Sequence, residues 1–448
     1  MSPAAYEFLS LDLPAMATGT LCALTCALLG NFLVLRRESL MGDAVSHAIL
    51  PGLVIGFLIT GSRATLPMFL GAAAAGAVTV GMVSLVRSLG RVEPGAAMGV
   101  VFSVMFALGV ILIEQAAARG VDLDPDCVLN GQLERVFWFP PETWDGFFRW
   151  STLGALPREL LTAAGMTVAT VLFIAMFFKE LRIAAFDPAL ATSLGFSARL
   201  LHAALMLAVA AAVVASFEAV GSILVIAMLV CPAATARLLT DRLGSQILAS
   251  AAIALVIGIG GYLAAAQGPA LFGGEFALSA AGMMAVAAGA ILFSTIIASP
   301  RYGVVARAIR RARLSIDIAR EDLLAELYRL EERPSAAPEP RTAAAWIRRR
   351  AAVSAVSRGE ITGSGAAPRL TPTGRAAAAG IVRAHRLWET FLVDKVMLKP
   401  DHVHATATDL EHVTDTQLAD ALARSVASPA SDPHGRPIPT GDGTRDVR

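Results

Sequence analysis

The stretch "RRESLMGDAVSHAILPG", from Arg36 to Gly52, places ionisable side chains inside a strongly apolar part of the chain. Two arginines end one long apolar run, and Asp43 and His47 lie just inside the next one. If a helix restarts after Arg37, a rise of about 1.5 Å per residue puts His47 about 15 Å along it, roughly half of the hydrocarbon core. Ionisable groups at that depth are costly and usually mark a pathway. The stretch therefore predicts a functional site within a membrane span.

Asp43 and His47 share one face of that helix, because four residues separate them. Pro51 follows one turn later and frees backbone groups near the pair. A carboxylate and an imidazole that converge at mid-membrane are suitable ligands for a divalent first-row metal. Two structural interpretations stay open: an Asp–His hydrogen bond that only fixes helix packing, and Asp43 as a helix N-cap at the membrane interface.

The composition indicates that most of the chain lies in a membrane. Of the 448 residues, 55 % are hydrophobic and 16 % are charged, and the mean hydropathy of +0.62 is too high for a soluble protein of this length. Of the 37 lysines and arginines, 14 precede Pro300 and 23 follow it, so a membrane part precedes a charged tail. The predicted fold is an all-α polytopic membrane protein with about nine transmembrane helices. The apolar windows are 13–35, 43–60, 64–86, 96–115, 159–178, 199–216, 220–238, 245–266 and 277–298.

Positive charges in the short loops predict the orientation, because cytoplasmic loops are enriched in lysine and arginine. They follow the odd-numbered windows, whereas the loop after the second window has only Arg63 and residues 267–276 have none. The chain is therefore predicted to begin outside and end in the cytoplasm. The basic residues behind this prediction are Arg36, Arg37, Arg87, Arg91, Lys179, Arg182, Arg199, Arg237, Arg242 and a cluster from Arg301 to Arg313.

Two long motifs carry a family resemblance. "RRESLMGDAVSHAILPG" and "FEAVGSILVIAMLVCPAATARLLTDR" (217–242) resemble the permease subunits of bacterial ABC importers for manganese, zinc and iron, over roughly residues 10–300. The resemblance implies a multi-pass inner-membrane subunit that passes a divalent cation inward, with Asp43 and His47 on the metal path. It also implies three partners: a separate ATPase, an extracytoplasmic metal-binding protein, and a second permease copy or paralogue.

The lysines agree with a transport subunit that is not an enzyme. None of Lys179, Lys395 and Lys399 follows a glycine, so the Gly-Lys-Ser/Thr of a P-loop is missing and the chain alone is expected to bind no nucleotide. The stretch "FDPALATSLGFSARL" (186–200) resembles the short cytoplasmic helix that such permeases dock into their ATPase, with Asp187, Leu194 and Gly195 as its marked residues. An ordinary amphipathic connector is the alternative interpretation.

Glu218 is the other carboxylate near the membrane path. The helix division places it in the outer turn between the sixth and seventh spans. Either that hairpin dips inward and Glu218 joins the metal path, or Glu218 is an entry residue. A solvated turn carboxylate is the alternative without function.

The charged tail is divided by composition. Residues 1–299 form the permease domain, and residues 300–341 form a basic membrane-proximal helix and linker, whose arginines are expected to contact anionic lipids of the inner leaflet. Residues 342–426 are predicted to form a cytoplasmic domain whose first helix is 314–333. The polar, Pro- and Gly-rich residues 427–448 are predicted to be disordered.

The tail carries a second resemblance. "RLTPTGRAAAAGIVRAHRLWETFLVDKVM" (369–397) and "VHATATDLEHV" (403–413) resemble metal-dependent repressors of the diphtheria-toxin-repressor type, and "REDLLAELYRLEE" (320–332) resembles their first helix. The resemblance implies a mainly α, winged-helix-like domain that binds metal and dimerises. It assigns His385, Glu389 and His404 to one metal site. It assigns Glu411, His412 and, from the first helix, Asp322 to another.

Departures from that repressor pattern limit what the tail is expected to do. Ala325 and Thr408 stand where manganese-type relatives supply carboxylates, and the segment before the wing is too short for a full helix-turn-helix, so no DNA partner is expected. The tail is interpreted as a sensor of incoming metal, or as a degenerate domain that buttresses the permease. A membrane-tethered, metal-responsive regulator without transport is the alternative function. Manganese, zinc and iron stay open, because Asp, Glu and His ligands suit all of them.

Overall fold

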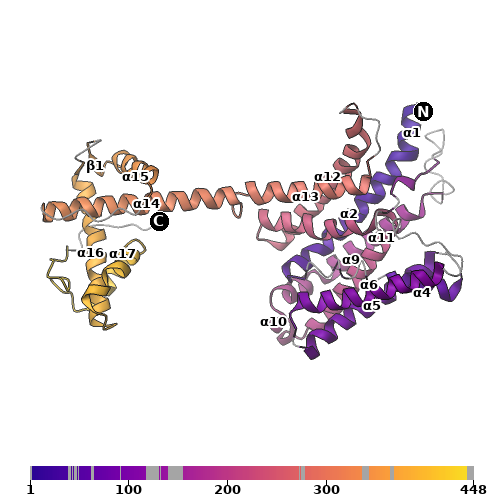
Figure 1. Cartoon of the computed structure of the whole chain (residues 1–448), viewed down its shortest axis with the longest axis horizontal. Helices are drawn as coiled ribbons and strands as arrows, with labels where there is room; N and C mark the ends of the chain where they lie inside the picture. The colour runs from indigo at the N-terminus through magenta and orange to yellow at the C-terminus, as the bar shows by residue number, and fades with distance from the viewer. Residues whose placement is uncertain are drawn as a thin grey trace. The chain divides into compact units, whose positions relative to one another are not determined.

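The computed structural model describes residues 3–38, 42, 44, 48, 50–61, 65–90, 92–117, 131, 133–139, 155–271, 273, 278–334, 343–363 and 368–440. The chain divides into two compact units, residues 1–305 and 306–448 (Figure 1). Within the described residues, eight helical segments are long and apolar enough to cross a membrane. The expected span at 43–60 is described only in part, as a helix from Leu50 to Thr60.

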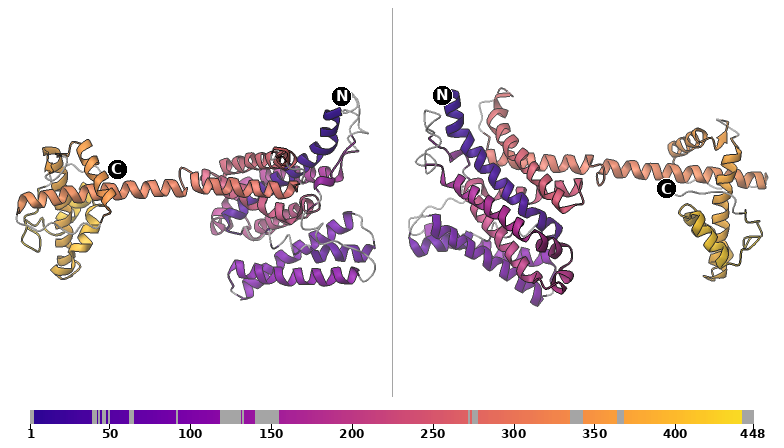
Figure 2. Two further views of the ribbon diagram at one scale, coloured as in Figure 1. Left: turned by 45° about the horizontal axis from the view of Figure 1, so that its top comes forward. Right: turned by 180° about the vertical axis from the view of Figure 1, so that it is seen from behind.

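The first unit is helical throughout its described part. Its helices are α1 (Pro3–Glu7), the π-helical turn η1 (Phe8–Asp12), α2 (Leu13–Leu35), α4 (Leu50–Thr60), α5 (Thr65–Gly90), α6 (Pro94–Ala117), the 3₁₀ turn η2 (Leu133–Arg135), α9 (Arg158–Phe186), α10 (Pro188–Ser193), α11 (Ala198–Leu239), α12 (Leu243–Leu271) and α13 (Ala280–Ala298). Helix α2 packs against α9, α11 and α12, while α4, α5 and α6 pack together as a layer (Figure 2).

Helix α2 is the most enclosed of the spans, and its polar side chains are satisfied inside the bundle. The Thr25 hydroxyl bonds to the carbonyl of Leu21 and lies 2.8 Å from the Thr167 hydroxyl on α9. The Asn31 amide donates to Ser250 Oγ at 2.6 Å and accepts from Gln246, both on α12. Such hydrogen bonds hold helices together in lipid, where water cannot replace them.

Close backbone contact holds α2 against α11. A Cβ atom at Gly30 would lie 1.9 Å from the carbonyl oxygen of Leu229, so only glycine fits there. Further out, large apolar side chains are exposed on α5, α6, α9 and α12, for example Leu70, Val104, Leu172 and Val256. Exposed apolar surface on long apolar helices is what a bilayer covers. The multi-pass membrane architecture is thus evident on both its inner and its outer faces.

Helix α11 is broken at Gly221, whose backbone has φ 73° and ψ 171°, a conformation essentially restricted to glycine. The break lies two residues inside the second of two candidate spans, Ala198–Phe217 and Ala219–Leu239. Glu218 therefore belongs to the helical backbone just before the break. The backbone of Gly131 approaches Val220 and Gly221 closely at this point.

The second unit is a small helical domain with a two-stranded hairpin. Its elements are α14 (Val304–Glu332), α15 (Ala345–Ser357), β1 (Ile361–Thr362), β2 (Arg369–Leu370), α16 (Pro372–Asp394), the 3₁₀ turn η4 (Pro400–His402), α17 (His404–Glu411) and α18 (Thr416–Ser425). The strands are antiparallel, with Ile361 opposite Leu370. The predicted first helix, 314–333, corresponds to the second part of α14, which begins ten residues earlier and ends at Glu332.

The chain after α18 differs from the predicted disordered tail as far as residue 440. Asp432 is buried, and the amide of Ile438 donates to the carbonyl of Ala430 at 2.9 Å. The physical reason is Arg386 on α16, whose buried guanidinium donates to Glu332 and to the carbonyl of Pro437. A buried arginine needs such acceptors, and the returning segment supplies one of them. Residues 441–448 lie outside the described part.

Candidate functional site

The predicted metal path through the membrane is described only at its borders. Asp43 and His47 lie outside the described residues, and Glu218 is described as backbone only. Of the residues between the two predicted ligands, Ala44 is buried, and Ala48 is buried directly after His47. The structure thus leaves the ligand assignment of the membrane motif as a prediction.

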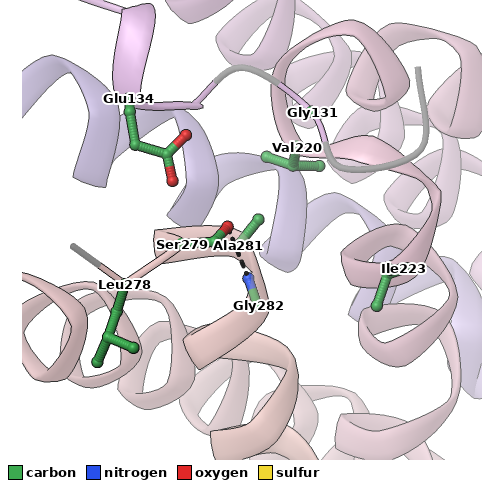
Figure 3. A pocket seen from close by; sticks show the side chains of 8 residues that line it. All are labelled: Gly131, Glu134, Val220, Ile223, Leu278, Ser279, Ala281 and Gly282. Atoms are coloured by element: carbon green, nitrogen blue, oxygen red, sulfur yellow. Dashed lines mark hydrogen bonds between the residues drawn. The ribbon is translucent and has the colours of Figure 1, made fainter. Parts of the chain in front are cut away.

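A cavity of about 520 Å³ lies beside the break in α11. Its lining includes Gly131, Glu134, Val220, Ser279 and Gly282 (Figure 3). The Glu134 carboxylate points toward Ser279 (Figure 3). It accepts a hydrogen bond of 2.8 Å from the amide of Ala280. That contact caps the start of α13, where an acidic group is favoured by the helix dipole. The carboxylate is therefore accounted for by helix capping.

The predicted ATPase-docking loop contains a short helix, α10. Asp187 is its N-cap, and its carboxylate accepts from the amides of Ala189 (3.0 Å) and Leu190 (2.9 Å). Gly195, with φ 88°, follows the helix, and Leu194 before it is 55 % exposed. An N-capped helix with an exposed leucine at its end offers a surface for a partner. Its docking role stays a prediction.

The second unit brings three of the predicted metal ligands together. His385 and Glu389 lie one turn apart on α16, and His404 begins α17. His385 Nε2 lies 3.1 Å from Glu389 Oε1 and 3.0 Å from His404 Nδ1, and the latter two atoms are 3.0 Å apart. Ligands at right angles, about 2.1 Å from an ion, are about 3.0 Å apart, so this triangle has the spacing of a metal site.

A carboxylate orients the first histidine of this triangle. His385 Nδ1 lies 2.6 Å from Glu411 Oε2, and both side chains are buried. Metal-binding histidines commonly donate their other ring N–H to a carboxylate, which fixes the tautomer and raises ligand basicity. Glu411 therefore leaves Nε2 of His385 facing Glu389 and His404.

The second predicted group also converges. His412 Nε2 lies 3.1 Å from Asp322 Oδ1 on α14 and 3.8 Å from Glu411 Oε1. The other ring nitrogen of His412 bonds to Glu321 at 2.8 Å. Asp322, Glu411 and His412 can thus offer one ligand atom each to a common ion. The two positions that depart from the repressor pattern add none: Ala325 is buried, and the Thr408 hydroxyl bonds to the carbonyl of His404.

Protons compensate the charges in these groups when no metal is bound. Burial lowers the pKa of His385, but its hydrogen bonds with Glu389 and Glu411 outweigh burial and raise that pKa above the usual value. Burial likewise opposes ionisation of Glu389, yet bonds to His385 and His404 hold its pKa well below the usual range. For His412, bonds to Asp322 and Glu321 outweigh burial and raise the pKa to about 9. A cation entering either group would displace protons, as metals generally do.

The sequence reasoning missed a third group, formed by Glu389, Asp432 and His434. His434 Nδ1 lies 3.7 Å from Glu389 Oε2, which is buried without a hydrogen-bond partner. Asp432 Oδ2 also accepts no hydrogen bond, although it lies 3.8 Å from Arg386 Nε. Buried carboxylate oxygens that accept no hydrogen bond are rare and fit a cation ligand. The Pro- and Gly-rich composition of residues 427–448 predicted disorder, so no site was expected there. The signal was His434 itself, because the chain has only seven histidines and this one follows an aspartate by two residues.

Comparisons with known proteins agree with both halves of this description. The ABC 3 transport family matches residues 5–135 and 150–296, well over half of the chain. The iron dependent repressor, metal binding and dimerisation domain, matches residues 371–440, which include every clustered ligand except Asp322. Both resemblances predicted from the sequence motifs are confirmed.

Similar proteins span nearly all of their own length in the alignment. The zinc transport system membrane protein TroD of Treponema pallidum is 37 % identical over 79 % of this chain and 94 % of its own. The manganese transport system membrane protein MntD of Bacillus subtilis is 38 % identical over 66 % of this chain and 94 % of its own. PsaBC from Streptococcus pneumoniae, solved in complex with Fab, has a TM-score of 0.53 at 26 % identity, covering 67 % of this chain and 98 % of that one.

The chain therefore belongs to the ABC 3 transport family, as a membrane permease subunit that is not itself catalytic, and it carries a C-terminal domain of the iron-dependent-repressor type.

Proposed function

We propose that this permease carries a divalent transition metal, manganese or zinc in the first place and iron as the third candidate, into the cytoplasm. Two similar proteins are named as zinc and manganese transport proteins, which supports this substrate class. Membership of the family implies a separate ATPase and a binding protein as partners. In this proposal Asp43, His47 and Glu218 form the metal path in a dimeric permease core, and α10 docks on the ATPase.

We further propose that the C-terminal domain lies in the cytoplasm, binds the incoming metal and reports its level to the permease. The observation that carries this proposal is the triangle of His385, Glu389 and His404, with ligand atoms 3.0 to 3.1 Å apart. A bound ion would exchange the protons shared by these side chains for one compact positive charge and would tie α16 to α17.

The two metal roles require different tests. Uptake of radiolabelled manganese, zinc and iron is measured in cells that lack their own importers and co-express this chain with its ATPase and binding protein. His47→Ala is expected to abolish uptake at normal membrane levels, because it removes a path ligand. Glu389→Gln is expected to leave the initial rate intact and to change how uptake responds to metal already in the cytoplasm.

His402→Ala is the matched control for the C-terminal domain, since His402 is a neighbouring histidine whose side chain is 70 % exposed and pairs with Asp401. This variant should show the wild-type uptake rate and the wild-type response of uptake to cytoplasmic metal. Full uptake by His47→Ala would contradict the metal path. A wild-type complex without uptake for any metal would contradict the transport proposal and favour the tethered regulator. An unchanged metal response in Glu389→Gln would contradict the sensing role.

A further inference from the structure

The carboxylate of Glu38 lies buried where the ends of several helices of the first unit meet. Its side chain is 7 % exposed, and its Oε1 accepts a hydrogen bond of 3.2 Å from Arg87 near the end of α5. Its Oε2 lies 3.5 Å from Arg36 Nε and 3.6 Å from His202 Nδ1 in the first turns of α11. One buried anion thus joins α2, α5 and α11.

The backbone holds Glu38 rigidly against the end of α2. The amide of Glu38 donates to the carbonyl of Leu33 (2.9 Å), and the amide of Arg37 donates to that of Val34 (3.2 Å). Arg37 adopts a left-handed conformation, with φ 58°. This is the Schellman pattern of helix termination, so the backbone of Glu38 is fixed to the end of α2.

The same cluster holds both helices that flank α10. Arg36 donates through Nη1 to the carbonyl of Ala184 at 3.2 Å, three residues before Asp187, the N-cap of α10. On the other side, His202 lies five residues after Ser197, the N-cap of α11. Helix α10 lies at the end of the bundle remote from the N-terminus (Figure 1). Displacement of α10 would therefore act on Glu38 through the two flanking helices, α9 and α11.

We propose that Glu38 is a positioning residue that couples movement of α10 to the ends of α2 and α5. The proposal rests on the proposed function, in which α10 docks on the ATPase. A buried carboxylate is costly to separate from its cationic partners, so the helix ends that surround it move together. Coupling through such a contiguous network requires an element that both sites displace, and the Glu38 carboxylate contacts Arg36 after α2, Arg87 of α5 and His202 of α11.

The test uses the full chain assembled with its ATPase and binding protein in lipid vesicles, with manganese or zinc as the probe. Metal uptake and ATP hydrolysis are measured in the same vesicles, and their ratio is compared among variants. Glu38→Gln keeps the side-chain shape but removes the charge. We expect it to retain ATP hydrolysis and to lower uptake per ATP by about tenfold, within the range of coupling between two sites.

Asp241→Asn is the matched control. Asp241 pairs with Arg301 and Tyr302 on the same unit and is 43 % exposed, so its loss should leave the ratio unchanged. If Glu38→Gln fails to assemble, Arg87→Gln provides the test, because Arg36 still compensates Glu38.

A ratio equal to that of wild type in Glu38→Gln and in Arg87→Gln would overturn the coupling role and leave the transport proposal intact. If the wild-type complex takes up no metal, the transport proposal fails separately. Coupling is then read from the stimulation of ATP hydrolysis by the metal-loaded binding protein. Loss of that stimulation in Glu38→Gln supports the positioning role, and full stimulation contradicts it.

Discussion

The two units of this chain bury opposite kinds of side chain. Among the described side chains of the first unit, Glu38 is the one buried charged residue, and the buried polar groups are mostly hydroxyls and amides. The second unit is about half as long, yet it buries Arg320, Glu360, His385, Arg386, Glu389, Glu411 and Asp432. The difference shows that close packing governs the first unit, whereas charge compensation governs the second.

This difference has a physical basis. Between helices in lipid the hydrophobic effect provides little attraction, so van der Waals contact at small residues and a few hydrogen bonds decide stability. A small domain in water has a small apolar core, here two clusters around Leu324 and Leu387, and ion binding can add what that core lacks. The predictions below test this contrast, starting from the largest expected effect.

The largest effect is expected where two backbones touch in the first unit. Gly30→Ala adds a Cβ atom 1.9 Å from the carbonyl oxygen of Leu229, so α2 and α11 must separate. We expect a loss of about 3 kcal/mol or more in the free energy of unfolding, because backbone rather than a side chain must move. The apparent Tm of the purified full chain in detergent measures it.

Gly165→Ala is the control for that substitution, since a Cβ atom at Gly165 on α9 meets nothing within 4 Å. It should leave the Tm unchanged or raise it, because alanine favours helix. Equal losses of Tm in the two variants would contradict this explanation, because an effect of alanine in any helix, and not close backbone contact, would then account for both.

The second effect concerns metal and the C-terminal unit. Manganese or zinc at about one hundred times its dissociation constant should stabilise that unit by about 2.7 kcal/mol. Glu389→Gln should abolish this stabilisation, because Glu389 takes part in two of the clusters. Hydrogen exchange of the α16 amides in the full chain, with and without metal, measures it. The exposed His402→Ala variant should keep the protection, and metal-dependent protection retained in Glu389→Gln would refute the ligand assignment.

A smaller effect is expected from the polar contact between α2 and α12. Asn31→Leu leaves Gln246 and Ser250 without their shared partner, at a cost of about 1–2 kcal/mol for buried groups left unpaired. The apparent Tm in detergent is again the measurement. Ser103→Ala should shift it little, because the Ser103 hydroxyl is exposed and bonds within its own helix. A raised Tm in Asn31→Leu would show that apolar packing alone suffices there.

The smallest effect is local to α10. Asp187→Ala removes both side-chain bonds at its N-terminus, so the helix should lose about 1 kcal/mol of stability, the usual value of an N-cap. Faster amide exchange in residues 188–193 and weaker binding of the ATPase are the readouts. Asp187→Asn, which keeps a capping side chain, should retain both. If the two variants bind the ATPase equally weakly, ATPase binding depends on the charge of Asp187 and not on its role as N-cap.

The sequence was sufficient for the features that depend on local pattern. Long apolar windows predicted the spans, and i,i+4 spacing placed His385 and Glu389 on one helix face, where the structure has them 3.1 Å apart. The motif resemblance also brought Asp322 to His412 across ninety residues of sequence. These predictions succeeded because helical periodicity and transferred motifs carry spatial information.

Other features depended on tertiary contacts that no local pattern carries. The chain around Asp432 is ordered because Arg386, buried on another element, requires acceptors, and Pro- and Gly-rich composition alone favours disorder. The role of Glu38 was equally hidden, since its partners Arg87 and His202 are distant in the sequence. Charge compensation is a property of the folded state, so neither composition nor spacing could predict it.

One carboxylate links two of the candidate metal-binding groups, because Glu411 belongs to the group of Asp322 and His412 and also orients His385 of the other group. Glu411 presents Oε2 to His385 and Oε1 to the group of His412 and Asp322. An ion bound by Asp322, Glu411 and His412 would polarise and shift the Glu411 carboxylate, and would thereby weaken its hydrogen bond to His385. An ion bound by His385 would in turn change how Glu411 faces Asp322 and His412. The two sites should therefore be thermodynamically linked, with equal and reciprocal effects on each other's affinity. Such linkage would make the domain respond to metal over a range of concentration that neither site would set alone.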